Sequence, residues 1–119
     1  MSRVTIEIPG MRLASENALR REHWAKRRRR ENAQACNVNA YWFSKGAHFV
    51  SWTPPVRVRL TRVGKALLDG DNLQGAFKHV RDEIARLLKL DDADPRIAWE
   101  YGQEIGAYGV RIEIEERKS

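Results

Sequence analysis

The amino-acid sequence predicts a single small α+β domain over residues 1–119, with a β-α-β-α-β-β order and two helices packed on a mixed sheet. Three observations support this fold class. Three segments alternate apolar and polar residues, as half-buried strands do. Two other segments repeat apolar residues at helical spacing. The chain has 119 residues, of which 42% are hydrophobic, and this is enough for one core.

The first half of the chain predicts one strand and one helix. In residues 3–8, Val4, Ile6 and Ile8 alternate with polar side chains, and Pro9-Gly10 ends the strand. Residues 18–43 contain neither Gly nor Pro, and we expect a helix in the second half of this segment. The residues that recur there at helical spacing are Ala33, Cys36, Ala40 and Phe43.

The second half predicts a strand, a helix and two further strands. Residues 56–63 alternate, with Val56, Val58 and Leu60 on the core side. Residues 72–89 form the clearest amphipathic helix. Its apolar arc consists of Leu73, Phe77, Val80, Ile84, Leu87 and Leu88. Two final strands are expected over 96–103 and 110–115, and Gly106 and Gly109 allow a hairpin between them.

Charge and composition restrict the class of partner and the compartment. The net charge of +6 and the pI near 9.9 favour a polyanion, either nucleic acid or an anionic membrane surface. The single cysteine, Cys36, excludes an internal disulfide and a cysteine-based zinc site. No segment has the length and apolarity of a signal peptide or a membrane span. We therefore expect a soluble, cytoplasmic protein.

Residues 20–30 hold seven Lys or Arg in eleven positions. Such dense like charge destabilises a helix unless an anion neutralises it, so nucleic acid is the favoured partner. Trp24 adds a surface for base stacking. A solvated charged face and a membrane-surface helix remain as alternatives. The expected DNA-binding residues are Arg20, Arg21, Lys26, Arg27, Arg28, Arg29 and Arg30, extended toward Asp69 by Arg62 and Lys65.

Two groups of carboxylates are candidates for metal binding. Asp69-Gly70-Asp71-Asn72 precedes the expected helix 72–89, and Asp91-Asp92 follows it. Mg²⁺ prefers such oxygen ligands, and bound ions can activate water for phosphodiester hydrolysis. The alternative is that these residues only cap a helix and form a turn. An EF-hand is excluded, because Val80 occupies the twelfth position, where a bidentate Glu is required.

The geometry of this pair of groups leaves two possibilities open. A straight helix over 72–89 would be about 27 Å long, which separates its two ends too far for one metal site. The groups can meet if the chain doubles back after the helix. They can also meet if the second group comes from another copy of the chain.

Three stretches resemble the RusA-type Holliday junction resolvases, which are small phage-derived endonucleases. These are Pro55-Val56-Arg57-Val58-Arg59-Leu60, Asp69-Gly70-Asp71-Asn72-Leu73-Gln74 and Leu90-Asp91-Asp92-Ala93. The resemblance implies a homodimer that cuts four-way DNA junctions with Mg²⁺ or Mn²⁺, in the cytoplasm of a bacterial or phage-infected cell. It also implies that Asp69, Asp71 and Asp92 are catalytic metal ligands, with Asp91 as their neighbour.

One position departs from that family's pattern. A lysine of the family falls on Gly75 here, and the resemblance implies that it gives electrostatic help at the scissile phosphate. We expect Lys78 or Lys65 to take this role, with His79 as another neighbour. Two other functions stay open: a catalytically weak or inactive protein that binds branched DNA, and a basic module that binds RNA or a protein partner.

Overall fold

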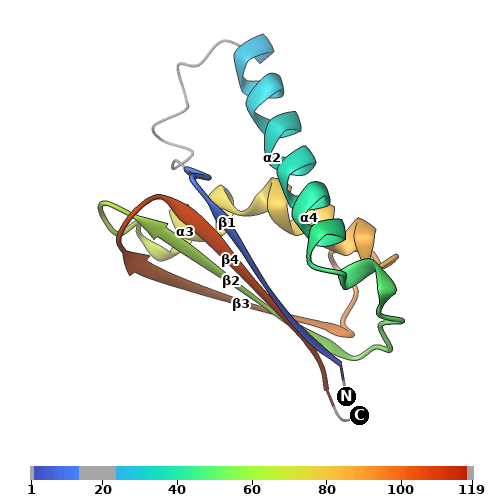
Figure 1. Cartoon of the computed structure of the whole chain (residues 1–119). Helices are drawn as coiled ribbons and strands as arrows, with labels where there is room; N and C mark the ends of the chain where they lie inside the picture. The colour runs from blue at the N-terminus through green and yellow to red at the C-terminus, as the bar shows by residue number, and fades with distance from the viewer. Residues whose placement is uncertain (1, 14–23, 118–119) are drawn as a thin grey trace.

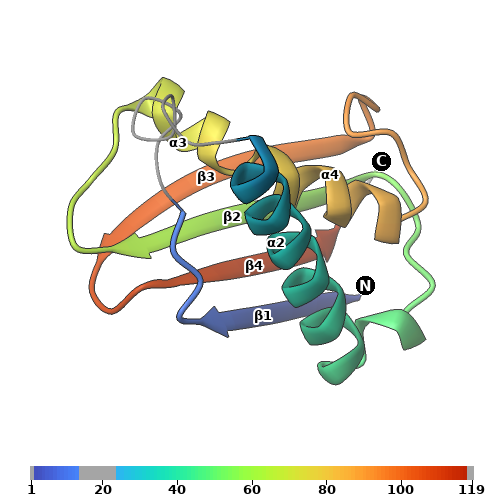
Figure 2. The same ribbon diagram turned by 90° about the horizontal axis from the view of Figure 1, so that it is seen from above.

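The computed structural model describes residues 2–13 and 24–117, and in these ranges the helices cover one face of a four-stranded sheet (Figures 1 and 2). The elements are β1 (Arg3–Pro9), α2 (Trp24–Ser44), the short 3₁₀ helix η1 (Ala47–Phe49), β2 (Val56–Gly64), α3 (Gly70–Ala76), α4 (Lys78–Leu87), β3 (Ile97–Ile105) and β4 (Gly109–Glu116). The expected α+β class with a mixed sheet is confirmed.

The strand order is β1-β4-β2-β3, which contradicts the expected hairpin between the last two strands. β2 lies between them, parallel to β3 and antiparallel to β4. The reason is the helical connection after β2, because a helical crossover returns the chain parallel to the strand that it left. The connection 106–108 then passes the end of β2, where the amide of Gly106 donates to the carbonyl of Gly64 at 2.9 Å.

The core lies between the sheet and the helices. The expected alternation is confirmed in β1, in β4 and in residues 56–60 of β2, although Val4 is only half-buried. It fails at the end of β2, where Thr61 is buried on the side that was expected to face solvent. The largest fully buried side chains are Phe77, Ile6, Ile8, Leu13, Leu60, Ile84, Ile112, Ile114, Val38, Val56, Val58 and Val80. Full burial of such a side chain contributes about 1.5–3 kcal/mol, so these residues dominate the stability of the fold.

α2 is longer than expected and buries a different face. Within the described residues it begins at Trp24 and so includes most of the basic segment. The residues that predict the helix by their spacing, Ala33, Cys36, Ala40 and Phe43, face solvent and do not form its buried side. The buried residues are Gln34, Val38 and Trp42, which repeat every fourth position. This face of α2 packs on the core because Val38 and Trp42 offer a larger apolar surface to bury.

The expected single helix over 72–89 is two helices. Phe77 separates α3 from α4, and its amide donates to the carbonyl of Gln74 three residues earlier, at 3.1 Å. The apolar arc itself is confirmed, since Leu73, Phe77, Val80, Ile84 and Leu88 are all buried. The break shortens each straight segment of the connection between β2 and β3.

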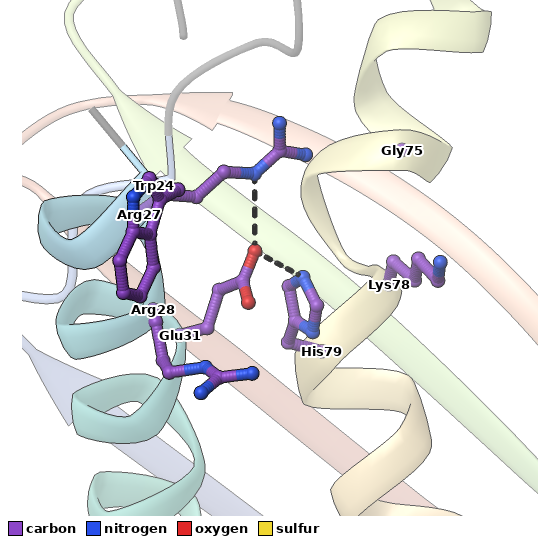
Figure 3. Close-up of a pocket in the computed structure, with 7 residues that line it drawn as sticks. All are labelled: Trp24, Arg27, Arg28, Glu31, Gly75, Lys78 and His79. Atoms are coloured by element: carbon purple, nitrogen blue, oxygen red, sulfur yellow. Dashed lines mark hydrogen bonds and ion pairs between the residues drawn. The ribbon is translucent and has the colours of Figure 1, made fainter. Parts of the chain in front are cut away.

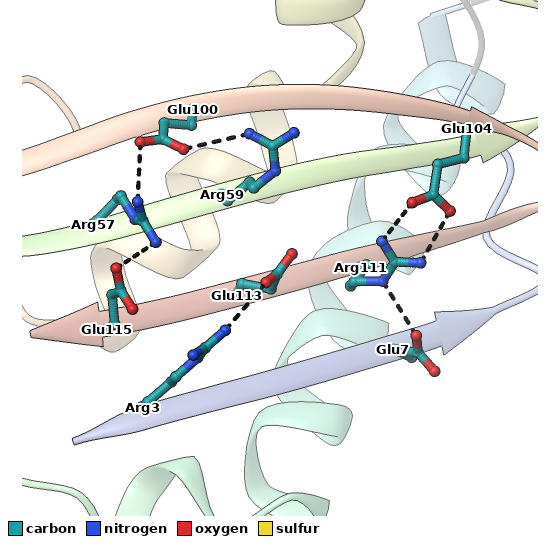
Figure 4. Close-up of polar contacts among 9 residues, drawn as sticks. All are labelled: Arg3, Glu7, Arg57, Arg59, Glu100, Glu104, Arg111, Glu113 and Glu115. Atoms are coloured by element: carbon teal, nitrogen blue, oxygen red, sulfur yellow. Dashed lines mark hydrogen bonds and ion pairs between the residues drawn. The ribbon is translucent and has the colours of Figure 1, made fainter.

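The other face of the sheet is open and carries a lattice of ion pairs (Figure 4). Arg57 pairs with Glu100 on one side and Glu115 on the other, across three strands. Arg111 binds Glu104 through two hydrogen bonds of 2.8 and 3.0 Å and also contacts Glu7. These hydrogen bonds lower the pKa of Glu104 below its usual value. This face is therefore polar and internally paired.

No helix in the described part of the chain is long and apolar enough to cross a membrane.

Candidate metal site and nucleic-acid interface

Asp69 and Asp71 lie at the start of α3. Asp69 occupies the N-cap position with extended backbone angles, and its carbonyl accepts the amide of Leu73 at 2.8 Å. Its carboxylate makes no capping hydrogen bond to the helix. Asp71 lies in the first turn, and both residues are exposed. The side chain of Asp69 is therefore not used in the way that a simple helix cap requires.

The backbone beside Asp69 is attached to β3. The amide of Leu68 donates to Oε1 of Gln103 at 2.8 Å, and Nε2 of Gln103 donates back to the carbonyl of Leu68 at 2.7 Å. This pair of hydrogen bonds fixes the loop that leads into α3 against the edge strand of the sheet.

The three aspartates of the acidic turn after α4, Asp91, Asp92 and Asp94, make different contacts. Oδ1 of Asp91 accepts the amide of Ala93 at 2.9 Å, which is an Asx turn. Asp94 accepts hydrogen bonds from the side chain and the backbone amide of Arg96, and these lower its pKa to about 2. The carboxylate of Asp92 instead faces α4. Among the three, Asp92 is the one whose side chain does not form the turn.

Arg81 on α4 holds the backbone and the side chain of Asp92. Its Nε lies 3.6 Å from Oδ2 of Asp92, and its Nη2 donates to the Asp92 carbonyl at 3.0 Å. Its Nη1 donates to the hydroxyl of Tyr101 at 2.8 Å. Trp99 also donates to the Asp92 carbonyl, at 3.0 Å, and its ring lies under the Arg81 guanidinium. Asp92 is thus fixed against α4 and β3.

The chain therefore doubles back after the helix, which is the first of the two ways in which the acidic groups could approach each other. Asp92 lies beside the first half of α4, not beyond the far end of a long helix. Both acidic segments contact β3, one through Gln103 and the other through Trp99. Even so, no three His, Cys, Asp or Glu side chains form a metal-binding group within residues 2–13 and 24–117. As they lie, Asp69, Asp71 and Asp92 do not form a ready metal-binding group, and the carboxylate of Asp92 is paired with Arg81.

Residues 24–30 of the basic segment form the first turns of α2. Lys26, Arg28 and Arg29 are exposed, as a phosphate-binding surface requires. Arg27 donates to Oε1 of Glu31 at 3.2 Å, and Arg30 is half-buried. Arg20 and Arg21 lie outside the described residues.

Arg62 is buried, which contradicts its expected role at a DNA surface. Its side chain is 6% exposed, and its guanidinium donates to the carbonyls of Leu13 at 3.0 Å and Ala66 at 2.7 Å. The reason is that Arg62 lies on β2, the strand between β4 and β3, where it ties two loops together. Lys65 is exposed, with its Nζ 5.8 Å from the ring centroid of Tyr108, and its expected role stays a prediction.

Lys78 and Gly75 lie at a pocket between α2 and the junction of α3 and α4 (Figure 3). The pocket is open, has a volume of about 700 Å³, and is lined by Trp24, Arg27, Arg28, Glu31, Gly75, Lys78 and His79. Lys78 is exposed and directed away from α2 (Figure 3). Its catalytic role stays a prediction.

Sequence reasoning missed Arg81 and its partners on β3. One signal was present: Arg81 follows Phe77 by four residues, so it lies at the margin of the apolar arc. A cation in that position is half-buried and needs a partner. The partners could not be found without the strand order.

Comparison of the sequence with models of known protein families gives no match, and comparison with curated proteins gives none either.

Proposed function

We propose that the protein is a metal-dependent endonuclease that nicks branched DNA, acts as a homodimer and is similar to the RusA-type Holliday junction resolvases. One observation carries the proposal. The resemblance gives metal-binding roles to Asp69 and Asp92, and these carboxylates are the ones that neither the helix cap nor the acidic turn uses. Exposed Lys26, Arg28 and Arg29 support a polyanionic substrate.

The proposed ion is Mg²⁺ or Mn²⁺, with Asp69, Asp71 and Asp92 as ligands and Asp91 beside them. Mg²⁺ takes few protein carboxylates, keeps several waters and accepts phosphate oxygens, so exposed carboxylates suit it. In the arrangement described, Asp92 would have to exchange Arg81 for the ion, or the group would have to be completed by the second protomer. A titration with Mn²⁺ followed by calorimetry tests this: Asp71→Asn and Asp92→Asn should each abolish binding.

The activity is tested with labelled four-way junctions and linear duplex in Mg²⁺, Mn²⁺ or EDTA. We expect nicking that is selective for the junction and absent in EDTA. Asp71→Asn should abolish nicking and retain junction binding. Asp82→Asn is the matched control, because Asp82 is an exposed aspartate of α4 outside the proposed site. Nicking that persists in Asp71→Asn, or in EDTA, would overturn the proposal.

A second function is favoured by the absence of a ready three-carboxylate group in the described residues and by Gly75 at the family's lysine position. The protein would then bind branched DNA without cutting it. Junction-selective binding with no nicking in either metal decides for this second function.

A further inference from the structure

The pocket between α2 and the α3–α4 junction combines an aromatic face with cations. Trp24 on the first turn of α2 is 69% exposed, so its indole offers a large face to solvent. Arg28 follows one turn later, and Lys78 lies on the opposite rim (Figure 3). An exposed indole beside cations is the combination that binds unpaired nucleotides, whose bases stack while their phosphates meet positive charge.

Glu31 holds the two walls of this pocket together. Its Oε1 accepts a hydrogen bond from Arg27 at 3.2 Å and lies 3.0 Å from Nε2 of His79. The first of these residues belongs to α2 and the second to α4, so the carboxylate joins the two helices. Its negative charge is offset within the wall by the Arg27 guanidinium, and Arg28 adds a further positive charge to the lining. The net field in the pocket therefore favours an anion.

The volume suits a small organic ligand. The pocket measures about 700 Å³, within the common range of about 300–1,000 Å³ for such sites. A nucleotide in a closed duplex keeps both base faces stacked on its neighbours and cannot present one to an indole. Within a DNA molecule, an unstacked nucleotide at a branch, flap or gap meets this condition.

We propose that this pocket binds one unpaired nucleotide of a branched DNA, with its base stacked on Trp24 and its phosphate held by Arg28. The proposal rests on the proposed function and narrows it, because it names the substrate class as branches that carry an unpaired nucleotide. We therefore expect a four-way junction whose bases are all paired to bind less tightly than a branch with an unpaired nucleotide, although still better than linear duplex.

The test is a duplex with a short single-stranded flap that carries 2-aminopurine at its first unpaired position, titrated in EDTA. Stacking on Trp24 should quench the 2-aminopurine fluorescence. Trp24→Ala should remove the quenching and weaken flap binding by about ten-fold or more, given the usual effect of one lost stacking contact. Trp24→Phe should restore part of both signals.

Two control variants match the substitutions. Phe49→Ala removes an aromatic ring that is 84% exposed and lies outside the pocket. Lys26→Ala removes an exposed cation of α2 outside the pocket, in parallel with Arg28→Ala. The pocket variants should lose several-fold more affinity for the flap than their controls. Circular dichroism at matched temperature checks that every variant is folded.

The proposal is overturned if Trp24→Ala leaves the quenching intact, if Trp24→Ala and Phe49→Ala weaken binding equally, or if the flap binds no better than linear duplex. Because the titration is done in EDTA, it does not depend on cleavage. If the wild-type protein quenches the fluorescence but nicks no junction, the result counts against the endonuclease alone. Junction nicking without quenching would count against the nucleotide pocket alone.

Discussion

Nε of Arg81 lies 3.6 Å from Oδ2 of Asp92, and this contact joins α4 to the acidic turn that follows it. Arg81 also donates to the carbonyl of Asp92 and to the hydroxyl of Tyr101. One guanidinium thus links a helix, a turn and the edge strand β3.

Replacement of Arg81 should destabilise the fold. Arg81→Met leaves the Asp92 carbonyl with one donor fewer and Asp92 without its cation, and we expect a loss of about 1–3 kcal/mol in the free energy of unfolding. Urea denaturation measures it. Arg86→Met is the control, because the Arg86 side chain is 63% exposed and pairs with Glu83 on its own helix, so its cost should be about 0–1 kcal/mol. Equal costs would contradict the structural role of Arg81.

Arg62 should matter for stability and not for DNA binding. In Arg62→Met the carbonyls of Leu13 and Ala66 lose their donors, at an expected cost of about 1–3 kcal/mol. Lys65→Met, at an exposed position in the same loop region, should change stability by less than about 0.5 kcal/mol. Junction affinity, measured at fixed salt where both variants are folded, should fall for Lys65→Met alone. A fall for folded Arg62→Met would show that this buried arginine reaches the DNA.

The Asp94–Arg96 pair should give stability a pH dependence in the acid range. The folded-state pKa of Asp94 is lowered from 3.8 to about 2 by hydrogen bonds from Arg96. A lowered pKa stabilises the folded state above the unfolded-state pKa, and this stability is lost as pH falls through the folded-state pKa. The difference in unfolding free energy between the wild type and Asp94→Asn should therefore be largest above about pH 4 and decline toward pH 2. A difference that does not change over this range would contradict the assignment.

Cys36 should react as an exposed thiol. The structure places it on the solvent side of α2, so an aromatic disulfide reagent should label folded and urea-unfolded protein at similar rates. The matched variant is Val38→Cys in a Cys36→Ser background, because Val38 is only 1% exposed. That thiol should be protected until the protein unfolds. Protection of Cys36 itself would mean that α2 buries the stripe expected from the sequence.

The sequence predicts those parts of the fold in which local pattern and burial agree. Alternation identifies β1, β2 and β4, because one face of each strand must be apolar to cover the core. The apolar arc around Phe77 and Ile84 is also correct. The buried face of α2 was missed, because Cys36 and the alanines repeat as regularly as Val38 and Trp42 do. Spacing does not distinguish two stripes, whereas buried area does.

The position of β3 depends on contacts between residues that are distant in the sequence, so the local pattern of apolar residues could not predict it. Gly106 and Gly109 allow a hairpin, but the pairing of β2 with both β3 and β4 excludes it. The same limit applies to the candidate site. The carboxylates could be named from their spacing, but Arg81, Trp99 and Gln103 meet them only through the crossover. Arg62 was misplaced because alternation alone does not show which polar side chains lie under loops.

The ion-pair lattice on the open face of the sheet affects how the protein meets a polyanion. The nine residues drawn there comprise four arginines and five glutamates (Figure 4), whereas the whole chain carries a net charge of +6. The positive excess therefore lies elsewhere, and α2 carries much of it. Such an uneven distribution steers an approaching polyanion before any contact forms, an effect that weakens as salt is added. A nucleic acid bound as proposed would therefore be expected to meet the helical side of the molecule first.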